Sequence, residues 1–181
     1  MHNPHKFGRP RRSCRPAQLG RIGSWNVEGL LGDSSIKRVE LQQMMHACNI
    51  DILCIQETHL LGKTCSIEDG FHYFLSGDIH EEITRSYAGV GFIVNPRVVA
   101  SVISFKALSS RLAVLRLKVV GGILDLVSAY APHGRLDFED RHDFFSSLGD
   151  IFRTFSNHNA TFVLGDLNTN LGRIYPGEEQ H

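Results

Sequence analysis

The chain of 181 residues lacks the features that mark membrane-spanning and secreted proteins. It has no run of 18 apolar residues and no apolar segment near its N-terminus, and these are the signals of a transmembrane helix and of a secretory signal peptide. It also has no internal repeat and no low-complexity segment. Its hydrophobic content of 42% and charged content of 21% are ordinary for a globular protein. We therefore expect one domain with a sizeable core and no membrane partner.

Cysteine is scarce, and its spacing excludes the common zinc and redox motifs. None of the four cysteines lies in a Cys-x-x-Cys or other zinc-ligand spacing (Cys14, Cys48, Cys54 and Cys65). Cys48 and Cys54 lie in apolar periodic segments, where a thiol usually packs as a small hydrophobic group. The sequence therefore indicates a reducing, intracellular compartment.

Net charge is also absent, because 19 basic residues balance 19 acidic ones. The distribution is uneven: residues 1–21 hold six basic residues and no acidic one, so the rest of the chain is about six units negative. A basic arm of this kind could tether nucleic acid. It could equally be a disordered leader, because Pro4, Pro10 and Pro16 oppose regular structure. We expect residues 1–20 to form a basic, disordered arm and residues 21–181 to form the domain.

The rest of the sequence alternates between helix-like and strand-like segments. Helices are predicted from Ser34 or Ser35 to about Ala47 and over residues 138–155. The apolar face of the first helix is expected to hold Ile36, Val39, Met44 and Ala47. Apolar runs rich in Val, Ile and Leu predict strands at residues 21–27, 51–56, 71–75, 89–94, 98–106, 111–119, 123–130 and 161–165, the last of them buried. This mixture indicates a layered α/β domain.

Carboxylate and amide side chains follow two of the predicted strands. Glu57 comes directly after one buried strand, and Asp166 and Asn168 come after another. Cleaving a phosphodiester requires a neutralised anion, a water in line with the bond, and a stabilised leaving oxygen. Mg²⁺ takes oxygen ligands and keeps several waters, so one or two carboxylates suffice. Glu57 is therefore a candidate metal ligand, and Asp166 and Asn168 are candidates for an acid or base and for a ligand of phosphate or water.

Each of these residues also has a purely structural interpretation. Polar residues often follow strands, and Gly, Asp and Asn are common in turns for reasons of backbone geometry. Asn26 alone would be a strand-end cap, and Tyr130, at the end of another strand, could be a packing residue. What favours the phosphate-cleaving site is the combination, because four strands each end in a group that this chemistry needs.

Five segments in combination resemble the endonuclease/exonuclease/phosphatase superfamily, which includes apurinic-site endonucleases, DNase I and retrotransposon endonucleases. They are SWNVEGL at 24–30, CIQETHL at 54–60, AGVGFIV at 88–94, SAYAPHG at 128–134 and VLGDLNTNLG at 163–172. The sequence looks most similar to the endonuclease domains of non-LTR retrotransposons, because AYAP is followed by an amphipathic helix and then by GDLNTNLGR. The resemblance implies an α/β (α+β) fold: a DNase I-like two-sheet β-sandwich with flanking helices.

The resemblance also implies a role for each candidate residue. Asn26 matches an amide near the metal, and Glu57 matches the principal ligand of Mg²⁺, which Mn²⁺ could replace. Tyr130 matches a tyrosine that contacts the scissile phosphate. Asp166 matches the carboxylate that activates water or protonates the leaving group, and Asn168 matches its phosphate-binding neighbour. The implied activity is hydrolysis of DNA, which would place the protein in the nucleus rather than the cytoplasm.

The sequence departs from the family pattern near its C-terminus. The family ends in a Ser-Asp-His motif that this chain lacks; His181 is terminal, and His133, His142 and His158 fall in a loop, a helix and a turn, so none is assigned the role. We expect the fold to lack its C-terminal strands and to expose apolar edges. We also expect weak or no activity, since one general acid or base contributes roughly 10²–10⁴-fold to the rate. The alternatives are a non-catalytic remnant that binds nucleic acid or a partner, and an enzyme acting on RNA tails, inositol phosphates or sphingomyelin.

Overall fold

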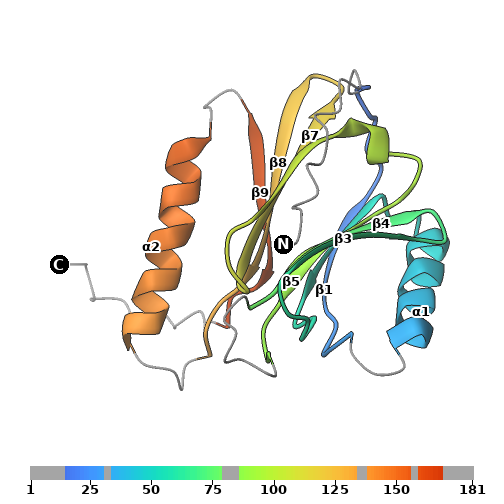
Figure 1. Ribbon diagram of the computed structural model, residues 1–181. Helices are drawn as coiled ribbons and strands as arrows, with labels where there is room; N and C mark the ends of the chain where they lie inside the picture. The colour runs from blue at the N-terminus through green and yellow to red at the C-terminus, as the bar shows by residue number, and fades with distance from the viewer. Residues whose placement is uncertain (1–14, 31–33, 79–85, 134–137, 156–158, 169–181) are drawn as a thin grey trace, which may run out of the picture.

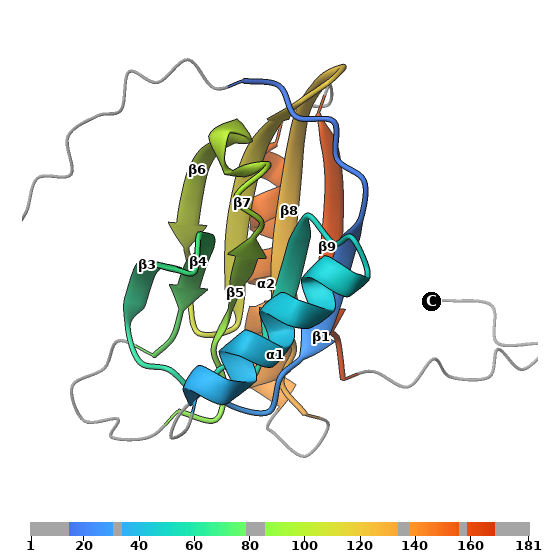
Figure 2. The same ribbon diagram turned by 90° about the vertical axis from the view of Figure 1, so that its right-hand side faces the viewer.

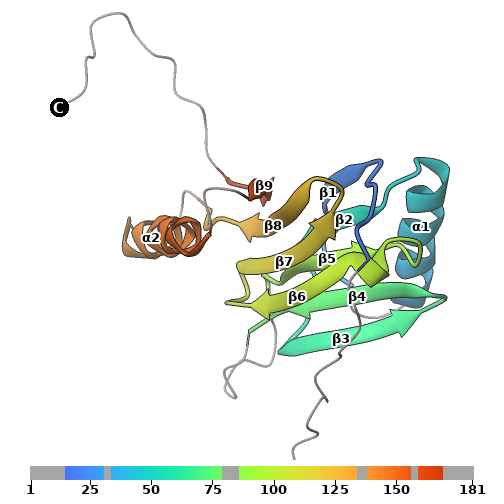
Figure 3. The same cartoon turned by 90° about the horizontal axis from the view of Figure 1, so that it is seen from above.

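Two β-sheets lie face to face, and one helix covers the outer face of each (Figure 1). The computed structural model describes residues 15–30, 34–78, 86–133, 138–155 and 159–168. Seen from above, the order of layers is helix, sheet, sheet, helix (Figure 3). This arrangement confirms the predicted DNase I-like two-sheet sandwich with flanking helices.

The first sheet contains five strands in the order β1-β2-β5-β4-β3. Their bounds are β1 Ile22–Asn26, β2 Ile52–Gln56, β3 Lys63–Glu68, β4 Phe71–Ser76 and β5 Val90–Val94. β1 and β2 are parallel, and the other pairs are antiparallel. Parallel neighbours need a crossover connection, which is provided by α1 (Ser34–Ala47).

The second sheet contains four strands in the order β6-β7-β8-β9. Their bounds are β6 Val102–Ala107, β7 Leu112–Val119, β8 Gly122–Tyr130 and β9 Ala160–Asp166. A short 3₁₀ helix, η1 (Val99–Ser101), precedes β6. β8 and β9 are parallel, and α2 (Phe138–Thr154) forms the crossover between them. Each sheet therefore ends in a parallel strand pair.

Apolar side chains fill all three interfaces between the four layers. The two sheets meet through β2, β5, β7 and β8, whose inward side chains include Phe92 and Leu115. α1 packs on the first sheet through Leu41 and Met45 (Figure 2), and α2 packs on the second through Phe144 and Ile151. Each such side chain contributes about 1.5–3 kcal/mol when fully buried, so the strands that carry the candidate site are held from both faces.

The elements differ from the prediction in three places. β3 was missed because its Lys63, Thr64 and Ser66 are polar, as is common in an edge strand. In α1 the buried residues are Leu41 and Met45, together with Gln42, whereas Ile36 is 61% exposed and Val39 is 41% exposed. Residues 98–100 are not a strand, since η1 comes before β6.

β9 is half exposed rather than buried. Among the described strands it pairs with β8 alone, and Phe162 is 55% exposed. β1 is likewise an edge strand, with Trp25 exposed on it. Both sheets therefore present apolar side chains at the edge where β1 and β9 lie.

The docked part of the chain begins before residue 21. The Ala17 N–H donates to the Lys118 carbonyl at 3.0 Å, and the Gly20 N–H donates to Asp51 Oδ2 at 2.5 Å. Residues 15–20 thus lie against the domain, while the expectation for residues 1–14 falls outside the described residues. Cys54 is buried as expected, but Cys48 is exposed rather than packed.

Candidate functional site

Four strands from two sheets bring their carboxyl ends to one end of the molecule. In the first sheet Asn26 of β1 pairs with Gln56 of β2, and in the second sheet Tyr130 of β8 pairs with Asp166 of β9. Gln56 also joins the two sheets, because its Nε2 donates to Ser128 Oγ at 3.2 Å. Parallel pairing within each sheet and this bridge between them place the predicted residues at a shared edge.

Glu57 is held in a strained backbone conformation by hydrogen bonds on both sides. Its φ of 54° lies in the left-handed region, which costs a residue other than glycine about 1–2 kcal/mol. The Gly29 N–H donates to the Glu57 carbonyl at 2.6 Å, and the Thr58 N–H donates to the Gly89 carbonyl at 3.0 Å. Strain of this kind is found at functional sites when the surroundings fix the conformation. The two bonds turn the chain sharply after β2.

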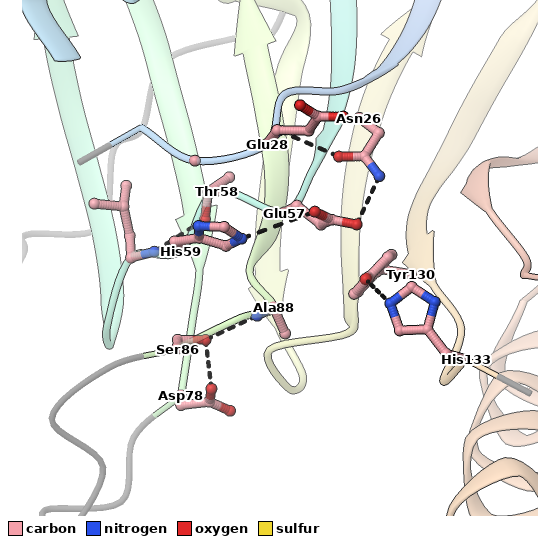
Figure 4. A network of polar contacts seen from close by, with 12 residues as sticks. Asn26, Glu28, Glu57, Thr58, His59, Asp78, Ser86, Ala88, Tyr130 and His133 are labelled. Atoms are coloured by element: carbon pink, nitrogen blue, oxygen red, sulfur yellow. Dashed lines mark hydrogen bonds and ion pairs between the residues drawn. The ribbon is translucent and has the colours of Figure 1, made fainter. Parts of the chain in front are cut away.

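The carboxylate of Glu57 is oriented by Asn26 (Figure 4). Asn26 Nδ2 donates to Glu57 Oε1 at 2.7 Å, while Asn26 Oδ1 accepts a hydrogen bond from the Glu28 N–H at 3.2 Å. His59 Nε2 lies 3.8 Å from the other carboxylate oxygen, Oε2. The amide of Asn26 thus has a fixed orientation and presents its NH₂ group to Glu57.

Asp166 and Asn168 form a turn that is attached to the end of β8. The Asn168 N–H donates to Asp166 Oδ1 at 3.0 Å, and Asn168 Nδ2 donates to the Ala131 carbonyl at 2.7 Å. An open hollow of about 560 Å³ lies beside this turn, lined by Ser24, Trp25, Asn26, Gln56, Gly165, Asp166, Leu167 and Asn168. Residues from the ends of β1 and β9 therefore face the same space.

Tyr130 lies between the two carboxylates. Only 2% of its surface is exposed, and the guanidinium of Arg111 lies 5.2 Å from its ring centre. Burial raises the pKa of Tyr130 well above its usual value; interaction with Glu57 and the charge of Asp166 raise it further, and Arg111 opposes them. The phenol therefore stays protonated and can donate a hydrogen bond at neutral pH. Tyr130 pairs with Asp166 across β8 and β9 and faces Glu57 (Figure 4), so the two carboxylates lie on the same side of the molecule.

The predicted residues are thus brought together, although their chemical roles stay predictions. Sequence reasoning missed two histidines, His59 beside Glu57 and His133 beside Tyr130. In the sequence analysis His133 is set aside as a loop residue in the wrong place. The structure corrects this, because His133 Nε2 lies 2.7 Å from the Tyr130 hydroxyl. The signal was its spacing of three residues from Tyr130 in the segment SAYAPHG.

The donor set at this edge suits a hard divalent cation. No group of three or more His, Cys, Asp and Glu side chains able to hold a metal is found among the residues that the structure describes. Mg²⁺ does not need such a group, because it is commonly bound by one or two carboxylates and retains several waters. The oxygens of Glu57, Asp166 and Asn26 meet this requirement. They fit Mg²⁺ or Mn²⁺ better than zinc, which favours cysteine and histidine ligands.

A match in sequence shows the family to which the chain belongs. Residues 23–176 match the model of the endonuclease/exonuclease/phosphatase family. The chain belongs to this family. The match covers every strand of both sheets except the first residue of β1, and it includes all the residues of the candidate site. No curated protein matches the chain in sequence.

Solved structures of the family have the same fold. A humanized D. rerio TDP2 superposes with a TM-score of 0.57 at 15% identity, covering 81% of this chain and 65% of that one. An AP endonuclease from Leishmania major gives 0.57 at 19%, covering 80% and 54%. The 3'-5' exonuclease NExo from Neisseria meningitidis gives 0.56 at 22%, covering 81% and 57%. The chain thus spans less than two thirds of the length of these family members. No helix in the described part of the chain is long and apolar enough to cross a membrane.

Proposed function

We propose that this domain hydrolyses phosphodiester bonds of DNA, using Mg²⁺, or Mn²⁺ in its place, held by Glu57 beside the amide of Asn26. The observation that carries the proposal is the cluster in which Asn26 orients Glu57, Glu57 faces Tyr130 (Figure 4), and Tyr130 pairs with Asp166 at the end of the second sheet. Members of the family with the same fold include an AP endonuclease and a 3'-5' exonuclease. Another, a D. rerio TDP2, has been solved with a single-strand DNA product.

The proposed chemistry divides among the side chains according to what each can donate or accept. A divalent ion at this site would neutralise phosphate charge and make a bound water more acidic. Glu57 would hold the ion, with Asn26 fixing its carboxylate. The protonated Tyr130 would donate a hydrogen bond to a phosphate oxygen, and the amide of Asn168 would donate another. Asp166 would take a proton from the attacking water or give one to the leaving oxygen.

Nicking of supercoiled plasmid DNA in Mg²⁺, compared with the same reaction in a chelator, tests this function. We expect the wild type to nick and both Glu57→Ala and Asp166→Ala to lose at least 10²-fold in rate. Glu40→Ala on α1 and Asp150→Ala on α2 are matched controls, because both carboxylates are exposed on the helices rather than at the strand ends. Equal nicking by all five proteins would show that another site or a contaminant is responsible.

A wild type that does not nick would contradict the proposal and favour the non-catalytic alternative, a remnant that binds nucleic acid or a partner. Parallel assays on RNA tails, inositol phosphates and sphingomyelin separate a change of substrate from a loss of catalysis. Release of product from one of these, lost in Glu57→Ala, would keep the site and replace DNA as its substrate.

We also propose that the domain derives from a non-LTR retrotransposon endonuclease and acts in the nucleus. The support is the run of AYAP, an amphipathic helix and GDLNTNLGR, together with DNA as the proposed substrate. Weak activity is part of the same proposal, because the family's Ser-Asp-His motif is absent from this sequence. A rate within tenfold of that of an AP endonuclease of this family on the same plasmid would contradict it.

A further inference from the structure

His133 is positioned by the chain that leaves β8 at the site. The Ala131 N–H donates to the Asp166 carbonyl at 2.9 Å, and the Ala131 carbonyl accepts from Asn168 at 2.7 Å. Ala131 is thereby held between β8 and the turn after β9. Pro132 follows and restricts the backbone further, and the next residue places an imidazole against the Tyr130 ring with the two planes at 84°. The position of His133 thus depends on the same turn that places Asp166.

The contact between His133 and Tyr130 is a hydrogen bond, since Nε2 and the phenol oxygen are 2.7 Å apart. A phenol has one proton to donate. If the proton points to His133, the tyrosine cannot donate it to Glu57; if it points to Glu57, His133 Nε2 must carry a hydrogen and donate to the phenol oxygen.

The surroundings decide between these two arrangements. The Glu57 carboxylate can only accept. It faces the Tyr130 hydroxyl (Figure 4), and its charge contributes to the raised pKa of the phenol. A charged acceptor gives a stronger hydrogen bond than a neutral imidazole nitrogen. The phenol proton is therefore directed at the carboxylate, and His133 is the donor to the phenol. Asn26 donates to the Oε1 atom of the same carboxylate, so the arrangement runs from His133 through Tyr130 to Glu57, whose orientation Asn26 fixes.

We propose that His133 is a positioning residue of the site: its Nε2–H donates to the Tyr130 hydroxyl and fixes the phenol proton toward Glu57 and the phosphate that would lie there. Arg111 covers the face of the Tyr130 ring and holds the ring in place, but a cation above a ring does not set the direction of the hydroxyl. His133 supplies that direction. The effect of His133 on catalysis rests on the proposed function. The hydrogen-bonding arrangement does not depend on that function.

The arrangement can be tested by NMR without metal or substrate. In protein labelled with ¹⁵N-histidine at a fixed pH where imidazoles are neutral, we expect the Nε2–H form of His133, assigned through His133→Phe. In protein labelled with ¹³Cζ-tyrosine, His133→Phe should shift the Tyr130 signal, assigned through Tyr130→Phe. His133→Gln, which keeps an N–H donor, should restore the shift in part. His142→Phe on α2 is the control, because His142 is exposed and pairs with Asp143, its neighbour in sequence.

Two results would overturn the proposal. One is the Nδ1–H form of His133, which would make the histidine the acceptor. The other is an unchanged Tyr130 signal in His133→Phe, as expected of a histidine that only packs. The tautomer is read in the wild type, and His133→Gln assigns the His133 signal if His133→Phe fails to fold.

The catalytic consequence is measured separately. Loss of one neutral hydrogen bond corresponds to roughly three- to tenfold in rate, so His133→Phe should lower kcat by that factor with little change in KM. In a Tyr130→Phe background the same change should have no further effect, because the two residues act as a unit. A wild type that cleaves nothing would refute the proposed function while leaving the NMR result to decide the role of His133. Additive losses in the double variant would refute the positioning role.

Discussion

Gly165 is the residue on which the position of Asp166 depends most directly. It pairs with Ala129 of β8, its φ is +153°, and a Cβ built on it would lie 1.8 Å from the Ala129 carbonyl oxygen. Non-bonded atoms pack at about 3.5–4.0 Å, so Gly165→Ala must move β9 away from β8 by roughly 1.5 Å or more. Overpacking and left-handed strain cost about 1–3 kcal/mol each, so we expect a loss of about 2–4 kcal/mol in the free energy of unfolding.

Gly149→Ala is the matched control because it makes the same chemical change on a helix. Gly149 lies within α2, and the nearest atom to its built Cβ is a side-chain nitrogen of Arg153 at 4.0 Å. Replacing a helical glycine by alanine stabilises a helix by about 0.5–1 kcal/mol, so the two variants should change stability in opposite directions.

Urea unfolding followed by far-UV circular dichroism measures both variants. Since Asp166 follows Gly165 directly, Gly165→Ala should also lower any cleavage rate by about 10²-fold, the cost of a misplacement near 1 Å. A Gly165→Ala protein as stable as the wild type would refute the reasoning, since the β8–β9 pairing would then not be as close as described. Destabilisation of Gly149→Ala by the same amount would refute it as well.

Three further predictions concern charge and protonation. Arg116→Met should cost about 3–5 kcal/mol in urea unfolding, because the fully buried Asp125 carboxylate loses its two-bond guanidinium partner; a loss below 1 kcal/mol would contradict this. The pKa of Tyr130 is raised, so its contribution to stability is fully present below pH about 10 and is lost as pH rises further; subtracting Tyr130→Phe from the wild type should reveal no phenolate absorbance until the protein unfolds. Burial lowers the pKa of His72, so its contribution is present above pH about 6.5 and is lost as pH falls; His72→Gln should reduce the decline in stability on acidification, and an unchanged decline would contradict the assignment.

The ends of the central strands were predictable from sequence because a strand inside the sandwich must be apolar, so the first polar residue marks its end. β2 and β5 are buried along their whole length, so a polar residue such as Glu57 directly after β2 marks both the strand end and a place where a side chain can reach solvent. The apolar run of β9 likewise located Asp166, which is its last residue, although β9 is half exposed. Strand pairing then brings together residues that are distant in sequence, which pattern and family resemblance together anticipated.

Features that depend on packing between elements could not be predicted in this way. The buried face of α1 includes Gln42, which donates to the Tyr73 hydroxyl at 3.0 Å and to the Glu68 carbonyl at 3.2 Å; apolar periodicity does not reveal a buried amide. β9 has an apolar composition but only one described neighbour, so its exposure depends on topology rather than on sequence. His133 reaches Tyr130 because Ala131, two residues before it, is hydrogen-bonded to Asp166, which is 35 residues further along the chain. No local sequence pattern encodes such a contact.

The central claim is that five side chains from four strand ends surround a single divalent ion. Titration of ¹⁵N-labelled protein with Mn²⁺ tests it most directly, because the ion broadens the NMR signals of nearby nuclei. We predict that amide signals at the candidate site broaden first, those of Asn26, Glu57, Tyr130, Asp166 and Asn168, and that Glu57→Gln abolishes this at the same Mn²⁺ concentration. Broadening that begins instead at the exposed acidic residues of α2, or that persists unchanged in Glu57→Gln, would contradict the account.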